Sequence, residues 1–321
     1  MTATMNRREV LKAGGALAAA SALPSGAFVD STFAPTPGAW RSFQTVKRLQ
    51  IAKPGDAMQA WVPLPGFDAP EWFRPGGSTW KTSSGTAEIK RDAKYGAEFL
   101  HVVWAGGDAA PSVEVTSKFE TRDRAVDLAK PGSTPDLSAE ERRLYTSATD
   151  LIPVDGIVKE TADKIAAGAG TDLDKARRIY EWIVDNTHRD PKTRGCGVGD
   201  IASMLRSGNL GGKCADLNAL YVGLARAVGL PARDVYGLRV VPSKFGYRSL
   251  GAGTENVTKA QHCRAESVPH GLWVGARRSR RRAQGRAGGA ARQSRAHRPE
   301  GRGRTQGAAR IEMVPANRRG S

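Results

Sequence analysis

The sequence predicts an α+β protein, with a β-rich region at residues 40–130 followed by a region at 135–266 in which helices pack on strands. Three observations lead to this prediction. In the first region apolar and polar residues alternate with a period of two, which is typical of strands that have one buried face. In the second region apolar residues recur at helical spacing. After Glu266 the composition changes abruptly, because residues 267–321 carry 14 arginines, no lysine and two acidic residues.

Most of the basic charge of the chain belongs to this C-terminal segment. The 321 residues have a formal net charge of +17, of which residues 267–321 contribute +12. The preceding 266 residues contain 35 basic and 30 acidic side chains, a net charge of only +5. A basic folded body, which would indicate nucleic-acid binding, is therefore not indicated, and we expect no nucleic-acid partner. The segment 267–321 has too few apolar residues to fold alone and is predicted to be a disordered basic tail.

Residues 1–27 are predicted to be an export signal. The charged stretch Asn6–Lys12 precedes an apolar stretch too short to span a bilayer, and a Ser-x-Ala step ends at Ala27. The pair Arg7-Arg8 resembles a twin-arginine signal, which exports proteins that have already folded. The alternative is an ordinary helical N-terminus with a chance arginine pair. The signal predicts a periplasmic or extracytoplasmic protein, and we expect no transmembrane segment.

Five runs of alternating residues lie between clusters of proline, glycine and aspartate, and they predict an antiparallel β domain. The runs are 43–51, 57–64, 86–92, 98–105 and 112–121. No catalytic constellation stands out among them. The tryptophans of this region are expected to pack in its core; they are Trp61, Trp72, Trp80 and Trp104.

Proline and glycine at 131–135 predict a linker, after which two helices begin at recognisable caps. Ser138 is followed three residues later by Glu141, the reciprocal pair that begins a helix. Thr171 precedes a second helix whose apolar residues fall on one face, which predicts that it packs on a core. These apolar residues are Leu173, Ala176, Ile179, Tyr180 and Ile183.

Cys214 begins a third helix, behind a glycine pair at 211–212 that predicts a flexible loop allowing close backbone approach. Gly229 ends this helix and Pro231 prevents its continuation. In the first turn of a helix, unpaired backbone N–H groups and the helix dipole favour a thiolate over a thiol. The same N–H groups could bind an oxyanion after the sulfur attacks a carbonyl. A base must accept the thiol proton, and His262, in a predicted strand, is the candidate.

Each of these features also has an ordinary explanation. A single cysteine at a helix start is usually a small buried residue, and a single histidine is usually structural or exposed. Three cysteines are too few for a disulfide framework or a zinc site, so one pair and one free thiol is the most that they predict. The ordered combination of glycine pair, cysteine helix, strand and histidine strand is what favours a catalytic site.

The segment GGKCADLNALYVGLARAVGLPARDVYG followed by QHCRAE resembles the bacterial branch of the transglutaminase-like superfamily over about residues 135–266. The resemblance implies a papain-like α+β core with a Cys-His-Asp triad. Cys214 matches the nucleophile and His262 the general base, while Asp216 belongs to the motif without matching a triad role. It implies acyl transfer or hydrolysis at a protein or peptide carbonyl, with no metal or cofactor. Some animal relatives use calcium, but no acidic ligand loop is visible here.

The third member of the triad is missing from the sequence, because no aspartate follows Asp234. The family continues with a Gly-Trp-Val-Pro-Val-Asp-Pro-like segment after the histidine strand. If one nucleotide is inserted near codon 267, the shifted codons of 268–284 permit such a segment, with its first aspartate across the codons of Arg278 and Ser279. We therefore hypothesise that the sequence is frameshifted from about Ser267.

Other interpretations remain open at this stage. The tail could be a basic arm for nucleic acid or an anionic surface, or an ordinary solvated tail. Without a complete triad, the chain could also be a non-catalytic exported binding protein of the cell envelope. The sequence does not predict an oligomeric state.

Overall fold

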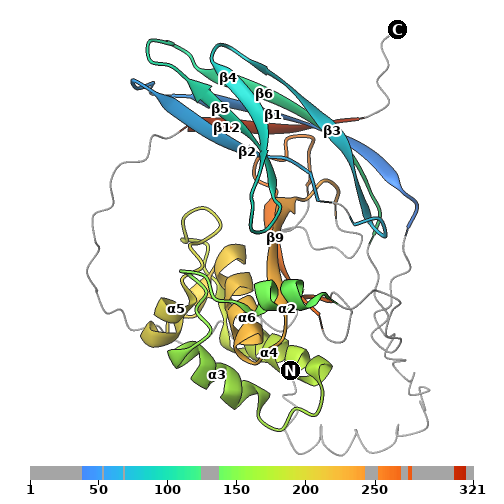
Figure 1. The fold of residues 1–321 in the computed structure, drawn as a ribbon, viewed down its shortest axis with the longest axis vertical. Coiled ribbons are helices and arrows are strands. Elements are labelled where there is room, and N and C mark those ends of the chain that lie inside the picture. Colours follow the sequence, from blue (N-terminus) through green and yellow to red (C-terminus); the bar gives the residue numbers. More distant parts are fainter. Residues whose placement is uncertain are drawn as a thin grey trace, which may run out of the picture. The chain divides into compact units, whose positions relative to one another are not determined.

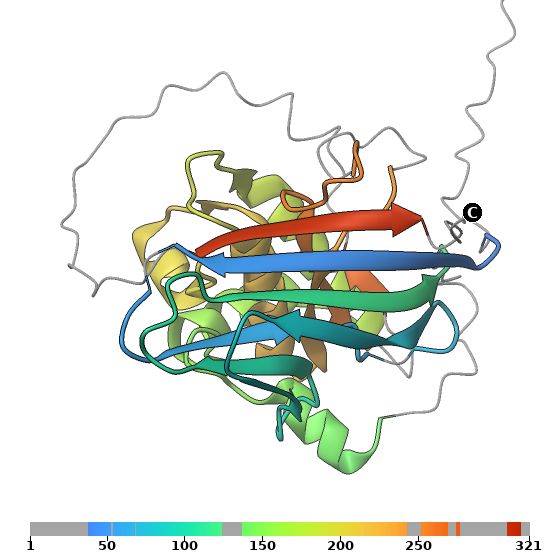
Figure 2. The same ribbon diagram turned by 90° about the horizontal axis from the view of Figure 1, so that it is seen from above.

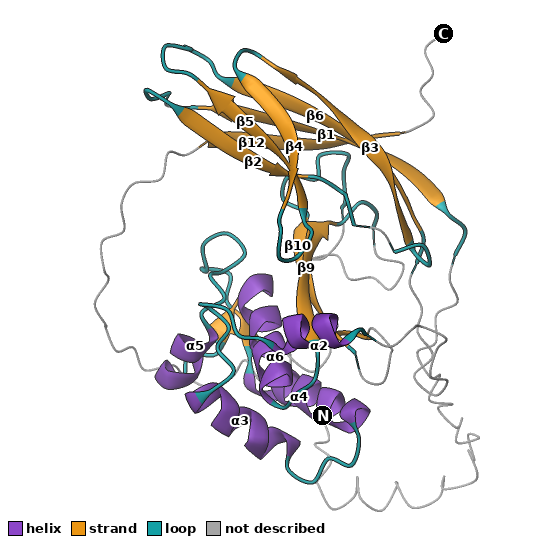
Figure 3. Ribbon diagram, viewed as in Figure 1, coloured by secondary structure: helices purple, strands orange, loops and turns teal. Residues whose placement is uncertain are grey.

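The computed structural model describes residues 38–52, 54–67, 69–123, 137–242 and 252–268, together with the backbone of 274–276 and 307–315. All of them belong to one unit of the chain, Thr36–Ser321. The predicted export signal at 1–27 lies outside the described residues. Figure 1 labels the elements and Figure 3 separates helices from strands by colour. Helices occur together with antiparallel sheets, which confirms the predicted α+β class.

Two antiparallel sheets form the β-rich region. The first has the order β12-β1-β6-β3, and Figure 2 shows its four strands side by side. Its members are β1 (Arg41–Ile51), β3 (Phe73–Thr82), β6 (Ser112–Thr121) and β12 (Gly307–Pro315). The second has the order β2-β5-β4. Its members are β2 (Met58–Pro63), β4 (Thr86–Arg91) and β5 (Glu98–Trp104).

The period-two alternation places one apolar cluster between the two sheets. Burial alternates along β5 and β6, as expected for strands with one buried face. The buried residues from both sheets form a single cluster, so the region is a β-sandwich. Trp104 belongs to this core and is fully buried. Trp61 lies outside this core: it is 59% exposed and packs instead by stacking on His101 of the neighbouring strand.

Strand β3 was not among the predicted runs. Its sequence contains Pro75, Gly76 and Gly77, a combination that normally indicates a turn. In the structure β3 pairs with β6 on both sides of this point, and the register shifts between Pro75 and Ser78. The glycines therefore form a β-bulge that lets the strand continue, which a pattern of alternating residues cannot reveal.

The region after residue 137 contains five described helices. They are α2 (Ala139–Thr146), α3 (Gly156–Ala166), α4 (Asp172–Asn186), α5 (Ile201–Ser207) and α6 (Cys214–Ala227). The predicted caps are present. The Ser138 hydroxyl accepts from the Glu141 amide at 3.1 Å while the Glu141 carboxylate accepts from the Ser138 amide at 2.9 Å. The Thr171 hydroxyl accepts from the Asp174 amide at 3.1 Å.

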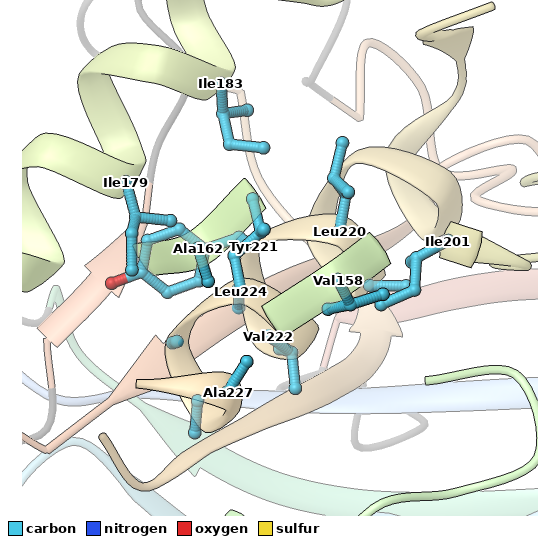
Figure 4. Packing of buried hydrophobic residues seen from close by; sticks show 14 of the residues in the cluster. Val158, Ala162, Ile179, Ile183, Ile201, Leu220, Tyr221, Val222, Leu224 and Ala227 are labelled. Carbon is cyan, nitrogen blue, oxygen red and sulfur yellow. The ribbon is translucent and has the colours of Figure 1, made fainter. Parts of the chain in front are cut away.

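Helix α6 is the centre of the second core. Most of its residues are buried, on nearly every side. Figure 4 shows side chains of α6 meeting residues of the surrounding helices. Those neighbours include Val158 of α3, Ile179 and Ile183 of α4, and Ile201 of α5. The helix ends before Gly229, whose φ of 78° lies in the left-handed region, as the sequence predicted.

A small three-stranded sheet of order β11-β10-β9 lies beside α6, and two of its strands pack on the helix. They are β9 (Ala232–Leu238) and β10 (Gln261–Ser267), followed by β11 (Val274–Ala276). At the far end of β10 the Glu266 carboxylate is buried, with its side chain 1% exposed. It accepts from Arg233 Nη2 at 3.0 Å and lies 2.8 Å from Arg264 Nη2. The paired charges make burial of this carboxylate tolerable and fix the end of the sheet.

Two segments of the expected disordered tail are strands in the structure. The backbone of β11 pairs with β10, and the backbone of β12 pairs with β1 over nine residues, from Gly307 to Pro315. Ser267 is the last residue of β10, and Val268 is buried, so both are ordered. Disorder therefore remains a prediction only for the residues of 269–321 outside β11 and β12, which lie outside the described part of the chain.

Candidate active site

Cys214 is the first residue of α6, as predicted. The glycine pair before it forms β8 (Gly211–Gly212), which pairs in parallel with β7 (His188–Arg189) and is not the flexible loop that the sequence suggested. Lys213 then has an extended backbone, with φ −105° and ψ −164°, which ends the strand and starts the helix. Cys214 therefore lies where the partial positive charge of the helix N-terminus is largest.

The carboxylate of Asp216 holds this helix start together. Its Oδ2 accepts from the Lys213 amide at 3.0 Å, and its Oδ1 accepts from the amides of Val198 at 2.8 Å and Gly199 at 2.9 Å. A Cβ atom added to Gly212 would lie 2.6 Å from the Asp216 side chain, which explains the need for glycine there. Asp216 is 8% exposed and its role is structural, which is why the motif contains it without a triad role.

His262 and Cys263 approach Cys214 from β10. The antiparallel register places His262 opposite Gly237 and Cys263 opposite Tyr236 of β9. The Asn218 side chain, one turn along α6, donates to the carbonyl oxygens of Cys214 at 2.8 Å and Cys263 at 3.0 Å. The two residues that the sequence proposed as nucleophile and base therefore come from α6 and β10, which are held in contact.

The surroundings of Cys214 favour its thiolate. The pKa of Cys214 is lowered to about 3, first by a hydrogen bond from the Cys263 side chain and also by hydrogen bonds from His262 and Cys196. Burial acts in the opposite direction but is outweighed. Such a sulfur is deprotonated at neutral pH and can act as a nucleophile.

The other two cysteines surround Cys214 and stay protonated. The pKa of Cys263 is raised, chiefly because its thiol is the hydrogen-bond partner of Cys214, and burial raises it further. Burial is the main cause that raises the pKa of Cys196, with the Cys214 sulfur second. All three are free thiols in the structure. Sequence reasoning identified Cys214 but had no signal for the convergence of Cys196 and Cys263 on it.

One of the helix N–H groups suggested as oxyanion donors is already used. The amide of Ala215 donates to the Cys196 carbonyl at 2.9 Å. This bond anchors the 196–199 loop beside the nucleophile and removes that donor from an oxyanion site. The amide of Cys214 itself stays the candidate donor from this helix.

Asp234 lies on the strand next to the histidine strand but is not placed to orient His262. It pairs with Ala265, three residues along β9 from Gly237, the partner of His262. Its Oδ1 atom is buried and has no hydrogen-bond partner among the described residues. Burial raises the pKa of Asp234 to about 7, although the charge of Arg226 acts in the other direction. Asp234 is thus a buried carboxyl group without an assigned role.

A shallow depression of about 300 Å³ lies near the site but does not contain the proposed nucleophile. Its lining comes from residues 193–200, α5 and the segment before α6, and it includes Asp216 and Val198. Within the described ranges, no cluster of three or more histidine, cysteine or acidic side chains could hold a metal ion. In the same part of the chain, no helix has the length and apolarity needed to cross a membrane.

Two segments of the chain match known families. Residues 159–276 match the model of the transglutaminase-like superfamily core, which includes α4, α6, Cys214, β9, β10 and His262. Residues 4–24 match the signal sequence of the twin-arginine translocation pathway. The export signal predicted from Arg7-Arg8 is therefore confirmed, and it directs the protein out of the cytoplasm by the twin-arginine route.

One relative and one solved structure extend the comparison. An uncharacterised protein of Haemophilus influenzae is 37% identical over 229 residues, which cover 67% of this chain and 61% of the relative. The chain thus spans about three fifths of that protein's length. The crystal structure of a candidate cysteine protease from Cytophaga hutchinsonii superposes with a TM-score of 0.60 at 13% identity. It covers 89% of this chain and 94% of the other, so the two share a fold.

The thiolate at Cys214 can be measured directly. Because its pKa is about 3, we expect its alkylation rate by iodoacetamide to stay nearly constant from pH 5 to pH 8. An ordinary thiol would lose about a thousandfold in rate over the same range. The measurement is the pH dependence of modification of the Cys214 peptide by mass spectrometry. Cys263, which is buried, serves as the internal control and should stay unmodified. A rate that rises through pH 8–9 would contradict the site geometry.

The buried Asp234 predicts a pH dependence of stability. Its pKa is about 7 in the folded chain and about 4 in an unfolded one. Between these values the folded carboxyl group keeps a proton that the unfolded one has released, so the free energy of unfolding falls as the pH rises from about 4 to 7. Asp234→Asn should reduce this decline in urea unfolding measured at pH 4, 5.5, 7 and 8. The exposed Asp163→Asn is the control. Equal declines in wild type and Asp234→Asn would refute the assignment.

Proposed function

From the transglutaminase-like core domain formed by residues 159–276, we propose that the chain is a cysteine enzyme that transfers or hydrolyses acyl groups through a thioester at Cys214. The observation that carries the proposal is the convergence of a helix N-terminal thiolate and the His262 side chain. No metal or cofactor takes part in the proposed reaction.

The proposed reaction has two steps. His262 takes the proton of the Cys214 thiol and the sulfur attacks the carbonyl carbon of an amide. The carbon–nitrogen bond then breaks as His262 passes this proton to the leaving amine. Water or a second amine then attacks the thioester, gives a proton to His262 and releases the acyl group from sulfur. Water gives hydrolysis and an amine gives transfer. The amide of Cys214 would stabilise the oxyanion in both steps.

The surface beside Cys214 favours a protein or peptide as substrate. Large apolar side chains are exposed on both segments that flank the cysteine: Val198 is 74% exposed and Tyr236 is 64% exposed. Val198 lies in the loop that contains Cys196, and Tyr236 is the strand partner of Cys263. Exposed apolar groups on either side of a nucleophile suit a polypeptide side chain better than a small polar molecule. The acyl donor is therefore proposed to be a peptide, isopeptide or glutamine side-chain amide.

The proposal predicts which substitutions abolish product formation. With glutamine-containing peptides, Cys214→Ser should reduce ammonia release or peptide cleavage to background, and His262→Ala should reduce it by about 10²- to 10⁴-fold. Asp163→Asn, an exposed substitution on α3 outside the site, is the control and should retain activity. Mass spectrometry with and without an added primary amine distinguishes transfer from hydrolysis. Product formation that survives Cys214→Ser would refute Cys214 as the nucleophile. A wild-type chain that forms neither product nor an acyl adduct on Cys214 would instead support an exported binding protein.

A complete triad further depends on the reading frame after about Ser267. The family match ends at residue 276, and no aspartate follows Asp234 in the present frame. We expect that sequencing the gene across codons 255–321 will reveal one extra nucleotide near codon 267. Its removal would restore a Val-Asp-Pro segment downstream of His262. A gene confirmed in the present frame, with no such insertion relative to the DNA of close relatives, would exclude this explanation.

A further inference from the structure

The Asn218 side chain links the helix of the proposed nucleophile, α6, to the strand of the proposed base, β10. The Nδ2 group of Asn218 donates to the Cys214 carbonyl at 2.8 Å and to the Cys263 carbonyl at 3.0 Å. Its Oδ1 atom accepts from the Ala265 amide at 3.0 Å. The amide has two N–H donors and one carbonyl acceptor, so both of its ends are used.

These bonds fix β10 relative to α6 in two places. Cys263 and Ala265 are two residues apart, so the carbonyl of the first and the amide of the second point to the same edge of the strand, and Asn218 binds both there. The pairing with β9 sets the register of β10 within its sheet, but it does not set the distance of the sheet from α6. Asn218 holds the strand against the helix beside Cys214. The hydroxyl groups of Tyr221 and Ser267, 2.8 Å apart, join the same two elements further along.

The same side chain also touches the sulfur of Cys263. Asn218 Nδ2 lies 3.6 Å from Cys263 Sγ, within the range of a hydrogen bond to sulfur. Both N–H groups of Asn218 already donate to carbonyl oxygens, so this contact places the Cys263 sulfur beside the first turn of α6 and adds no separate bond. The largest of the effects that lower the pKa of Cys214 is a hydrogen bond from the Cys263 side chain.

We propose that Asn218 is a positioning residue, whose amide holds β10 on the first turn of α6 so that His262 and the Cys263 thiol both face the Cys214 sulfur. It touches no substrate and acts through the residues that it holds. The inference rests on the proposed function in so far as Cys214 is the reacting thiolate.

The test is the pH profile of Cys214 alkylation in the full chain with two substitutions. Asn218→Asp keeps the acceptor for the Ala265 amide but removes both donors and adds a negative charge. Asn218→Ser keeps a hydroxyl that can donate to the carbonyl four residues before it, as Ser207 does to Ser203 at 2.7 Å, but is too short to reach β10. In both variants we expect the midpoint of the alkylation profile to move up by about one to two pH units, which lowers the rate at pH 4 about two- to tenfold relative to wild type, because charge-assisted hydrogen bonds to the thiolate are weakened.

A matched control removes an equivalent bond elsewhere. Asn186 Nδ2 donates to the Trp182 carbonyl at 2.9 Å, the same four-residue step within a helix, but makes no link to a strand. Asn186→Ser should leave the profile of Cys214 unchanged. Thermal unfolding and circular dichroism test whether each variant is folded. We expect Asn218→Ser to fold because it retains the intrahelical bond.

The outcomes separate this inference from the proposed function. If wild-type Cys214 reacts like an ordinary thiol, the proposed function fails and the positioning role fails with it. If wild-type Cys214 is a thiolate at pH 5 and the folded Asn218 variants keep the same profile, only the positioning role is overturned. A shift in the Asn218 variants but not in Asn186→Ser supports it.

Discussion

The site depends on one carboxylate, that of Asp216. Its three hydrogen bonds to backbone amides join the strand end before α6 to the 196–199 loop, which are far apart in the sequence. These bonds are charge-assisted and nearly shielded from water, so they are stronger than neutral surface bonds. They hold the first turn of α6 in a defined place, and the direction of the Cys214 side chain follows from that turn. The glycine at 212 is required because the carboxylate fills the space of a side chain.

Burial of α6 raises the pKa of Cys214, and hydrogen bonds from neighbouring side chains lower it by more. A helix surrounded by apolar side chains offers little water to a charged sulfur, so burial alone would raise the pKa of Cys214. Hydrogen bonds from Cys263, His262 and Cys196 replace the missing solvent. Since these donors come from β10 and from the 196–199 loop, the contact between these segments and α6 determines the chemistry of the sulfur.

The sequence predicted the parts of the site that depend on local rules. The helix start at Cys214 and the helix end at Gly229 are local, and so are the caps at Ser138 and Thr171. The flexible loop expected from the glycine pair is instead a strand, because its pairing with β7 is tertiary. The contacts of Cys196 with Cys214 and of Asn218 with β10 are tertiary, and no spacing within one segment encodes them. For the same reason the bulge in β3 was missed, because Gly76 and Gly77 indicate a turn unless the pairing with β6 is known.

Preparation of the nucleophile and orientation of the base come from different parts of the chain. Every group that lowers the pKa of Cys214 lies between residues 196 and 263, within the described residues. In the resemblance to transglutaminase-like enzymes, the aspartate that orients the histidine lies further along, where the present frame contains none. An orienting carboxylate chiefly stabilises the imidazolium that forms during proton transfer. In the proposed reaction, its absence would leave the thiolate intact but weaken the proton transfers to the leaving amine and from the attacking water. A chain without the aspartate would still present a reactive cysteine, while its turnover would be slowed.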